Sequence, residues 1–425
     1  MPADALYGVQ TARALDNFSV SALRIHGLFF TAYAEVKKAA AMTNMETGGL
    51  AREKGQVIVR AADEIIAGGH REQFRLDVFQ AGAGTSYNMN LNEVIANRAL
   101  ELLGARRGDY ARLDPNDDVN KSQSTNDTMP TVMRIASIRL ARQLTETLEK
   151  LAEAFDAKAD EFADVRKAGR THLHDATPMT LGEEFRAYGR NVERVAARIK
   201  QLEEPLLEIP LGGTAVGNGV NTKPEYARLA VRCLAELTGL PLREAEDRIQ
   251  LTQSVGDFVA LSGAVRAAAL ELSKIANDLR LLNSGPHTGM AEIELPALQP
   301  GSSIMPGKVN PAVAEMLNMA CFHVIGHDAA LTLCAEAGQL EVNVMMPYMA
   351  YAQLESLEIL TNAVRHFDEK CVRLIKAQRE RCAEHAKRSV GLAALHNEEL
   401  GFMGAAKLAE QAIETGKTIA ELTKG

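Results

Sequence analysis

The chain has 425 residues, 46% of them hydrophobic, and a formal net charge of -8 at pH 7. This length can bury a large core and form two or three structural units, while the negative charge argues against nucleic acid or an anionic membrane as the main partner. We find no leader segment, no apolar run of membrane-spanning length and no Cys-x-x-Cys pair, so we expect a globular cytoplasmic protein with reduced thiols.

The first polar stretch of interest follows two predicted helices at roughly 23–46 and 51–67. Residues 80–90 read QAGAGTSYNMN and precede a predicted helix at about 91–103. A helix N-cap explains one or two of these polar residues but not all of them. Thr85 is therefore a candidate ligand contact.

A second polar cluster, NDDVNKSQSTN at 116–126, ends in Ser124, Thr125 and Asn126. It lies just before Pro130 and a helix predicted over about 132–163. Free N–H groups and the helix dipole attract anions to such a position. A substrate carboxylate would fit there.

The next motif is GRTHLHDATP at 169–178, and it precedes a helix predicted over about 180–207. A single histidine is more often structural than catalytic. The glycine-rich stretch GGTAVGNGVN at 212–221 is typical of a flexible connection with tight turns. Another long helix is predicted over about 254–283.

Residues 301–311, GSSIMPGKVNP, join two long apolar-periodic segments but carry two hydroxyls, a lysine and an amide between glycines and prolines. This composition suits a carboxylate. An ordinary interhelical loop is the alternative, and a phosphate loop fits worse because Val309 follows Lys308. The following helix, about 312–334, contains His323 and His327. They lack an HExxH pattern and a third ligand at a recognised spacing, so we predict no metal.

The strings AGAGTS, GRTHL and GSSIMPGKVNP, together with GQLEVNVMMP at 338–347, resemble those of the aspartase/fumarase superfamily. The resemblance extends over nearly the whole chain. It implies an all-α fold with a central bundle of five long helices at 127–380, an N-terminal mainly helical domain at 1–126 and a small C-terminal helical domain at 381–425. The last appears incomplete for the family. A homotetramer is implied as well.

The resemblance also implies the chemistry. Such enzymes abstract a proton next to a carboxylate, form an aci-carboxylate dianion and release fumarate, without metal or organic cofactor. Ser302 would be the base, and Glu315 would orient His172. The residues implied to hold one carboxylate are Thr85, Ser124, Thr125 and Ser303, those for the other are Thr171, Lys308 and Asn310, and those facing the leaving group are Asn126 and His172.

The AGAGTS, CFHVIGHD and NVMMP strings favour elimination of ammonia from L-aspartate, whereas GRTHL and GGTAVG are shared or fumarase-like. Fumarate hydratase is thus the first alternative. A catalytically silent helical scaffold is the second, although the complete polar set speaks against it. Because a helix of about 30 residues spans roughly 45 Å, we expect Asn126 and His172 to be too far apart to meet in one chain. Each active site should therefore be shared between subunits.

Overall fold

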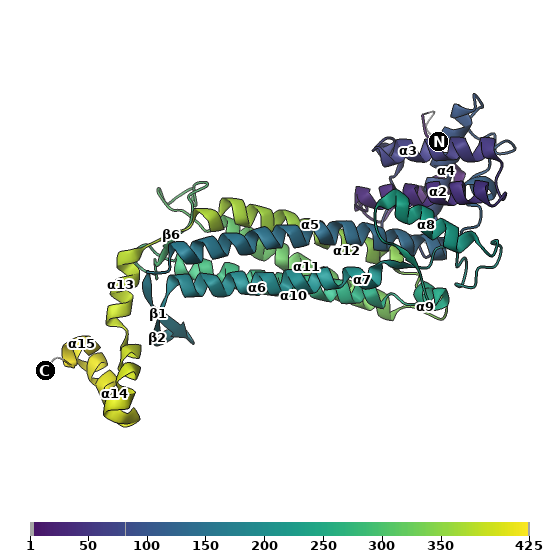
Figure 1. Cartoon of the computed structure of the whole chain (residues 1–425). Helices are drawn as coiled ribbons and strands as arrows, with labels where there is room; N and C mark the ends of the chain where they lie inside the picture. Colours follow the sequence, from purple (N-terminus) through teal and green to yellow (C-terminus); the bar gives the residue numbers. More distant parts are fainter. Residues whose placement is uncertain (1–3, 81, 424–425) are drawn as a thin grey trace. The chain divides into compact units, whose positions relative to one another are not determined.

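The computed structural model describes residues 4–80 and 82–423 (Figure 1). Ala81 of the AGAGTS string lies outside them. The described part is mostly helical, so the prediction of an all-α fold is confirmed. Its helices are α1 (Val9–Asn17), α2 (Gly27–Glu46), α3 (Arg52–Ile66), α4 (Thr85–Leu102), α5 (Thr125–Glu161), α6 (Leu181–Gln201), α7 (Glu203–Leu206), α8 (Tyr226–Thr238), α9 (Arg248–Gln253), α10 (Gly256–Leu282), α11 (Ala312–Glu336), α12 (Met346–Lys370), α13 (Arg379–Arg388), α14 (Asn397–Thr415) and α15 (Ile419–Leu422).

The strands in the described part form three small two-stranded sheets. The longest is the antiparallel hairpin of β1 (Arg166–Thr171) and β2 (His174–Thr180). The other two sheets pair β3 (Glu208–Ile209) with β4 (Arg243–Glu244) and β5 (Ile293–Glu294) with β6 (Lys376–Ala377). These short ladders fix the connections between helices and leave the fold helical.

The chain divides into two compact units. The first comprises Met1–Leu144, Arg198–Arg266 and His323–Ile359. Its core includes the fully buried rings of Phe29, Tyr33 and Tyr87. The ring centroids of Tyr33 and Tyr87 lie 5.6 Å and 5.2 Å from the centroid of Phe29. Such tilted and edge-to-face contacts are the favoured geometry of aromatic pairs.

The second unit comprises Thr145–Ala197, Ala267–Phe322 and Leu360–Gly425. Phe155 of α5 packs there against Phe185 and Tyr188 of α6 and Phe367 of α12, with ring centroids 5.8 to 6.4 Å apart. The apolar residues that recur at spacings of three and four thus face one another, as the sequence periodicity predicts. The domain boundaries after residues 126 and 380 remain a prediction.

The ends of several helices differ from those expected. The fourth helix begins at Thr85 instead of about 91, and α5 begins at Thr125 instead of about 132. Pro130 therefore lies inside α5, where its missing N–H removes only the bond to the carbonyl of Asn126. These earlier starts bring Thr85 and Thr125 into the first turns of their helices.

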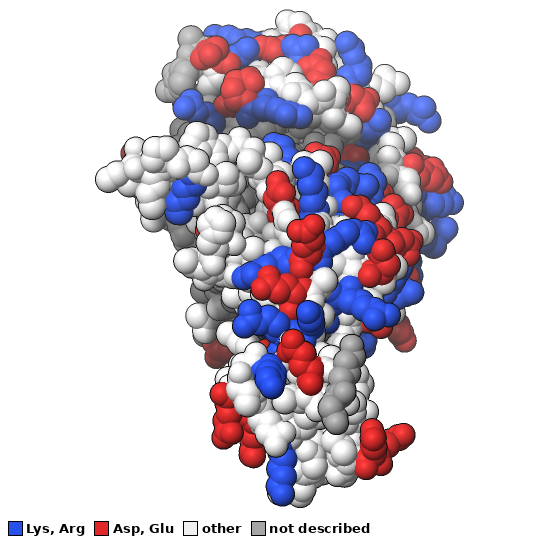
Figure 2. All heavy atoms as spheres, turned by 90° about the vertical axis from the view of Figure 1, so that its left-hand side faces the viewer, with Lys and Arg blue, Asp and Glu red and all other residues white. Residues whose placement is uncertain are grey.

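Charged side chains of both signs are interspersed over the face drawn in Figure 2. Among the ion pairs of the second unit are Arg379 with Asp164 at 2.8 Å and Arg186 with Asp156 at 2.7 Å. Because the signs are mixed, this face presents no large field of one sign to a polyanion. Among the described helices, none combines the length and apolarity needed to span a membrane.

Candidate active site

The first group of predicted ligands gathers where α4 and α5 begin. Thr85 is the first residue of α4, and Asn88, one turn further on, donates from Nδ2 to Oγ1 of Thr125 at 3.0 Å. Ser124 precedes α5 and accepts the N–H of Asn126 on Oγ at 3.2 Å. The structure thus links Thr125 through Asn88 to the helix turn that carries Thr85. Two helix N-termini and several hydroxyl groups make this a suitable anion site.

The hydroxyl cluster rests on a buried lysine. The Lys37 ammonium donates to Oδ1 of Asn88 at 2.6 Å and to Oδ1 of Asn120 and Oε1 of Gln123, both at 2.9 Å. Burial lowers the pKa of Lys37 to about 7, and the nearby Asp127 acts in the opposite direction. Three acceptors match the three donors of an ammonium group, so Lys37 fixes the position of Asn88 and through it Thr125.

Asp127 supports the same cluster from the other side. Its carboxylate accepts backbone N–H groups of Ser124 at 3.0 Å, Gly212 at 3.1 Å and Thr214 at 2.9 Å. Burial raises its pKa to about 6, and these hydrogen bonds oppose the shift. The glycine-rich stretch makes tight turns as predicted, with positive φ at Gly212 and Gly217. It is also held in place by Asp127, so it is more than a flexible connection.

Replacing Lys37 tests this support. We expect Lys37→Met to lower the free energy of unfolding by about 1–3 kcal/mol, because it leaves buried amide oxygens without a donor. Urea denaturation of the variant and the wild type measures this difference. The matched control is Lys38→Met, which removes an ion pair with the half-exposed Asp63 at 2.6 Å and should cost less than about 1 kcal/mol. Equal effects of the two substitutions would contradict the assignment.

The second group lies on the loop before α11, residues 301–311. The N–H of Gly301 donates to the carbonyl of Lys308 at 2.8 Å, and Nδ2 of Asn310 donates to the carbonyl of Gly301 at 2.9 Å. A Cβ on Gly301 would lie 2.8 Å from these same neighbours, so only glycine permits the closure. These contacts hold the two ends of the loop together, and most of the residues between them are exposed.

Ser302 sits in that loop with its Oγ facing two backbone N–H groups. Ile304 donates to Oγ at 3.1 Å and Met305 at 3.0 Å. A serine that accepts from residues two and three positions later is also a common turn motif. The same geometry places two preorganised donors where negative charge on Oγ would form.

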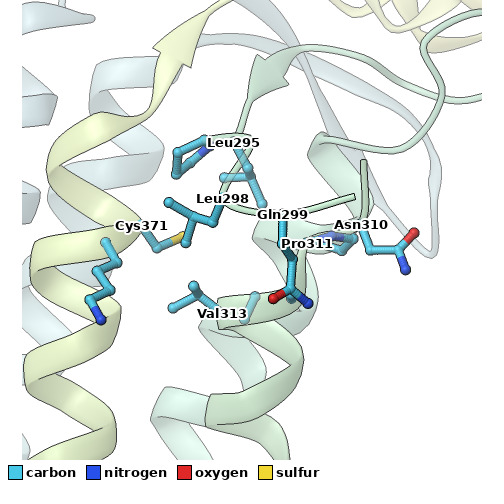
Figure 3. A pocket seen from close by; sticks show the side chains of 11 residues that line it. Leu295, Leu298, Gln299, Asn310, Pro311, Val313 and Cys371 are labelled. Carbon is cyan, nitrogen blue, oxygen red and sulfur yellow. The ribbon is translucent and has the colours of Figure 1, made fainter. Parts of the chain in front are cut away.

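Lys308 and Asn310 differ in exposure. Lys308 is exposed, and its side chain forms no ion pair with any residue that the structure describes. Asn310 lies at the rim of a small pocket that Leu295, Leu298 and Val313 also line. Its side-chain amide points away from these three residues (Figure 3). The lining is mostly apolar, so this pocket does not suit a dicarboxylate. The polar faces of the loop lie outside it.

Thr171 and His172 lie at the tip of the β1–β2 hairpin. Thr171 pairs with His174, which leaves His172 and Leu173 as a two-residue turn. Both have positive φ, 55° and 61°, as a tight hairpin of this kind requires, although neither is glycine. All four side chains are exposed. The segment 169–178, which lacks helical periodicity, is thus part of a hairpin with His172 exposed at its tip.

The structure does not bring every predicted residue together within one chain. Glu315, in the first turn of α11, has its oxygen 3.9 Å from Arg280. Among the described residues it forms no ion pair with His172. Thr85, Ser124, Thr125 and Asn126 belong to the first compact unit, whereas Thr171, His172, Ser302, Ser303, Lys308, Asn310 and Glu315 belong to the second.

Sequence reasoning missed three supporting residues: Asn88, Lys37 and Asp127. Asn88 lies inside the NMN string, but its role appears only because α4 begins before it. Lys37 lies in the helix stretch AEVKKAAA, where three charged residues stand among apolar ones, and Asp127 follows directly after Asn126. Charged residues inside an apolar pattern were the available signal, since a buried charge requires partners.

The chain is similar to several known proteins. A family model described as lyase matches residues 1–326. Aspartate ammonia-lyase of a Bacillus species is 49% identical over 99% of this chain and 90% of its own length, and that of Escherichia coli K12 is 48% identical over 99% and 89%.

Two solved structures also match. The fumarate lyase/delta crystallin of Brucella melitensis bound to cobalt has a TM-score of 0.96 and 47% identity, covering 100% of this chain and 93% of that one. The class II fumarase of Schistosoma mansoni has a TM-score of 0.95 and 34% identity, with coverages of 99% and 92%.

Proposed function

This chain belongs to the aspartase/fumarase superfamily of lyases, it eliminates ammonia from L-aspartate to give fumarate, and we propose that its four polar motifs perform this reaction together. A family model over most of the chain and relatives at about half identity support the activity. Fumarate hydratase is less supported, since the matched fumarase is 34% identical. The lyase family acts on a small dicarboxylate, which agrees with hydroxyl, amide and ammonium groups at the motif positions.

The proposed reaction begins with proton abstraction from C3 of aspartate. The Oγ alkoxide of Ser302 takes this proton, and the electron pair of the broken C–H bond moves into the adjacent carboxylate, which becomes an aci-carboxylate dianion. Collapse of the dianion forms the C2–C3 double bond and breaks the C2–N bond. Ammonia leaves with the electrons of that bond.

The observation that carries this assignment is the pair of N–H groups on Oγ of Ser302, from Ile304 and Met305. An alkoxide needs such donors, because a serine hydroxyl is otherwise too weak an acid to lose its proton. Removing one donor of this kind typically costs about 2.7–4 kcal/mol in the chemical step. Ser302 is therefore the residue we assign as base.

The remaining roles follow from the charges that develop. Thr85, Ser124, Thr125 and Ser303 would hold the carboxylate that becomes the dianion, where the N-termini of α4 and α5 favour negative charge. The other carboxylate would be held by Thr171, Lys308 and Asn310. The amine would face Asn126 and His172, with Glu315 orienting the imidazole. No residue in these roles requires a metal or an organic cofactor.

We also propose that each site is assembled from several subunits of a homotetramer. The α5 helix is continuous over 37 residues, which at 1.5 Å per residue is about 55 Å (Figure 1). Asn126 lies in its first turn, and His172 follows its other end. A four-carbon substrate cannot bridge such a helix, so a second copy must supply one of the two motifs.

The surface of α11 supports an oligomer. Met319, Phe322 and Leu333 are 61 to 69% exposed although this helix is apolar almost throughout. Spacings of 3 and 11 residues place the three side chains on one stripe of the helix. An exposed apolar stripe of this kind is typical of a surface that a partner covers.

Mixing inactive variants tests the shared site. We expect Asn126→Ala and His172→Ala proteins to regain activity when they are unfolded and refolded together, with about a quarter of the sites intact for random hybrids. The assay is fumarate absorbance with L-aspartate. Each variant refolded alone is the control. Hybrid oligomers that form without any recovery would contradict the proposal, since each chain carries one defect. The pair Ser302→Ala and His172→Ala shows in the same way whether the loop comes from a further subunit.

We infer a cytoplasmic location from the thiols. All five cysteines are free, and burial raises the pKa of Cys321 and Cys371 to about 12 and that of Cys382 to about 11. Reduced, buried thiols are usual in the cytosol.

A further inference from the structure

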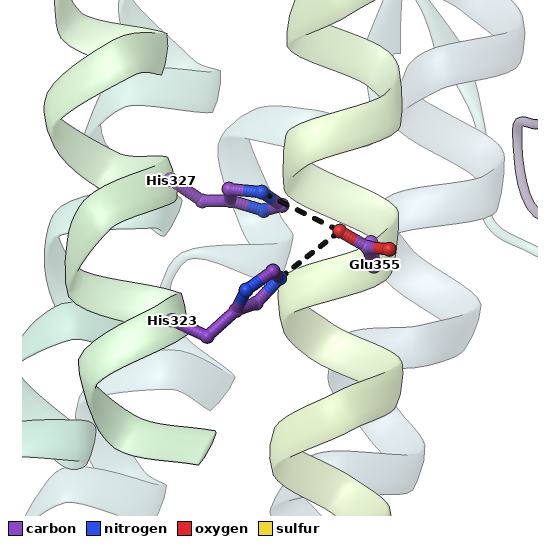
Figure 4. A group of neighbouring side chains, drawn as sticks. All are labelled: His323, His327 and Glu355. Atoms are coloured by element: carbon purple, nitrogen blue, oxygen red, sulfur yellow. Dashed lines mark hydrogen bonds and ion pairs between the residues drawn. The ribbon is translucent and has the colours of Figure 1, made fainter. Parts of the chain in front are cut away.

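His323, His327 and Glu355 form a cluster that the elimination does not use (Figure 4). The two histidines are four residues apart on α11 and so lie one turn apart on the same face. Glu355 faces them from α12. The sequence offered only the histidine pair. The third group, Glu355, is 28 residues beyond His327 and comes near the histidines only when the two helices pack together. The prediction of no metal was therefore made without this residue.

The ligand atoms converge on one point. Nε2 of His323 lies 3.1 Å and Nε2 of His327 3.4 Å from the same oxygen, Oε2 of Glu355. One ligand atom from each of the three residues lies within 4.8 Å of the others. Zinc binds nitrogen and carboxylate oxygen at about 2.0–2.2 Å, so the edge of a zinc tetrahedron is about 3.3–3.6 Å. The two observed separations are close to that edge.

A purely hydrogen-bonded cluster accounts less well for these distances. Charge-assisted N–H···O bonds are usually about 2.7–2.9 Å long, shorter than either separation. Two imidazoles would also have to donate to one carboxylate oxygen. The arrangement resembles three ligands around a common centre more closely than two hydrogen bonds.

The surroundings prepare the histidines for this role. Nδ1 of His327 is 3.4 Å from Oγ of Ser356, so a second partner occupies the nitrogen that faces away from Glu355. Ligating histidines commonly have such an outer partner, which orients the ring.

We propose that His323, His327 and Glu355 bind one divalent transition-metal ion such as Zn²⁺ or Co²⁺, which clamps α11 to α12. Two imidazoles and one carboxylate suit these ions better than Mg²⁺ or Ca²⁺, which prefer oxygen ligands. All three ligands lie in the first compact unit. Ser302 and its loop belong to the second unit.

The experiment uses the full chain after chelator treatment and dialysis. Titration with Co²⁺ should produce the visible absorption of tetrahedral cobalt and saturate at one ion per chain, and calorimetry with Zn²⁺ gives the dissociation constant. We expect His323→Gln and Glu355→Gln each to weaken binding about 100-fold or more, since loss of an outer partner alone typically costs 10–100-fold. The matched control is His366→Gln, which changes an exposed histidine of α12 outside the cluster. This variant should bind both ions with the affinity of the wild type.

Two outcomes would overturn the site. One is a wild-type chain that binds neither ion, and the other is unchanged binding in both folded variants, which would place the ion elsewhere. Thermal melting without metal shows whether each variant is folded, and His323→Gln is the milder change because its side chain is the more exposed. Turnover of L-aspartate is measured separately, so failure of the metal site and failure of the elimination can be told apart.

Discussion

The Ser302→Ala variant should lose nearly all turnover of L-aspartate while it keeps its fold and much of its substrate affinity. In the proposed reaction Ser302 acts on the proton, and its Oγ accepts the N–H groups of Ile304 and Met305. A general base typically contributes 10²–10⁴-fold, so we expect kcat to fall by about that factor. Steady-state kinetics, followed by fumarate absorbance, measures this loss.

Thr171→Ala is the matched control, because this hydroxyl is assigned to the other carboxylate, which does not become the dianion. A change that affects only the transition state lowers kcat and kcat/KM together, whereas lost binding that is equal in both states raises KM. A Ser302→Ala enzyme that keeps more than about a tenth of wild-type kcat would rule out Ser302 as the base.

The second large effect is expected for Lys308→Met, which should raise KM for L-aspartate strongly. Lys308 is the one cation among the motif residues assigned to the substrate, and a dicarboxylate would then face a site without it. Hydrogen bonds to charged groups contribute about 1.5–3 kcal/mol, which corresponds to roughly 10- to 150-fold in binding. Measuring KM alongside the dissociation constant of a non-reacting dicarboxylate separates binding from chemistry.

Lys308→Arg should rescue poorly, because a planar guanidinium cannot reproduce the compact ammonium. Lys407→Met, an exposed lysine on α14, controls for the loss of charge alone. An unchanged KM in Lys308→Met would show that this side chain does not contact the substrate.

Much of the helical architecture could be predicted from periodicity, because apolar residues spaced by three and four report the buried face of a helix directly. Helix ends were harder to predict. Gly84, in the left-handed region with φ of 92°, allows α4 to start at Thr85, and that start could not be read from a pattern of apolar side chains.

The candidate site likewise contains some residues that could be predicted from the sequence and others that could not. Its hydroxyls, lysine and histidine stood out as polar interruptions and matched family motifs, so Ser302, Lys308 and His172 could be proposed from sequence. The groups that support them could not. Lys37 and Asn88 are 51 residues apart, and their hydrogen bond exists only after α2 and α4 are packed. Glu355 likewise joins His323 and His327 only through the pairing of two helices.

The hairpin turn at His172 and Leu173 has a consequence for how this protein evolves. A non-glycine residue in the left-handed region costs about 1–2 kcal/mol, and Asn-Gly is the sequence that such a turn prefers. An Asn-Gly tip should therefore yield a more heat-resistant protein that has discarded its histidine. Under the proposed mechanism, selection for thermal stability alone would favour the Asn-Gly tip, whereas selection for turnover would favour His172.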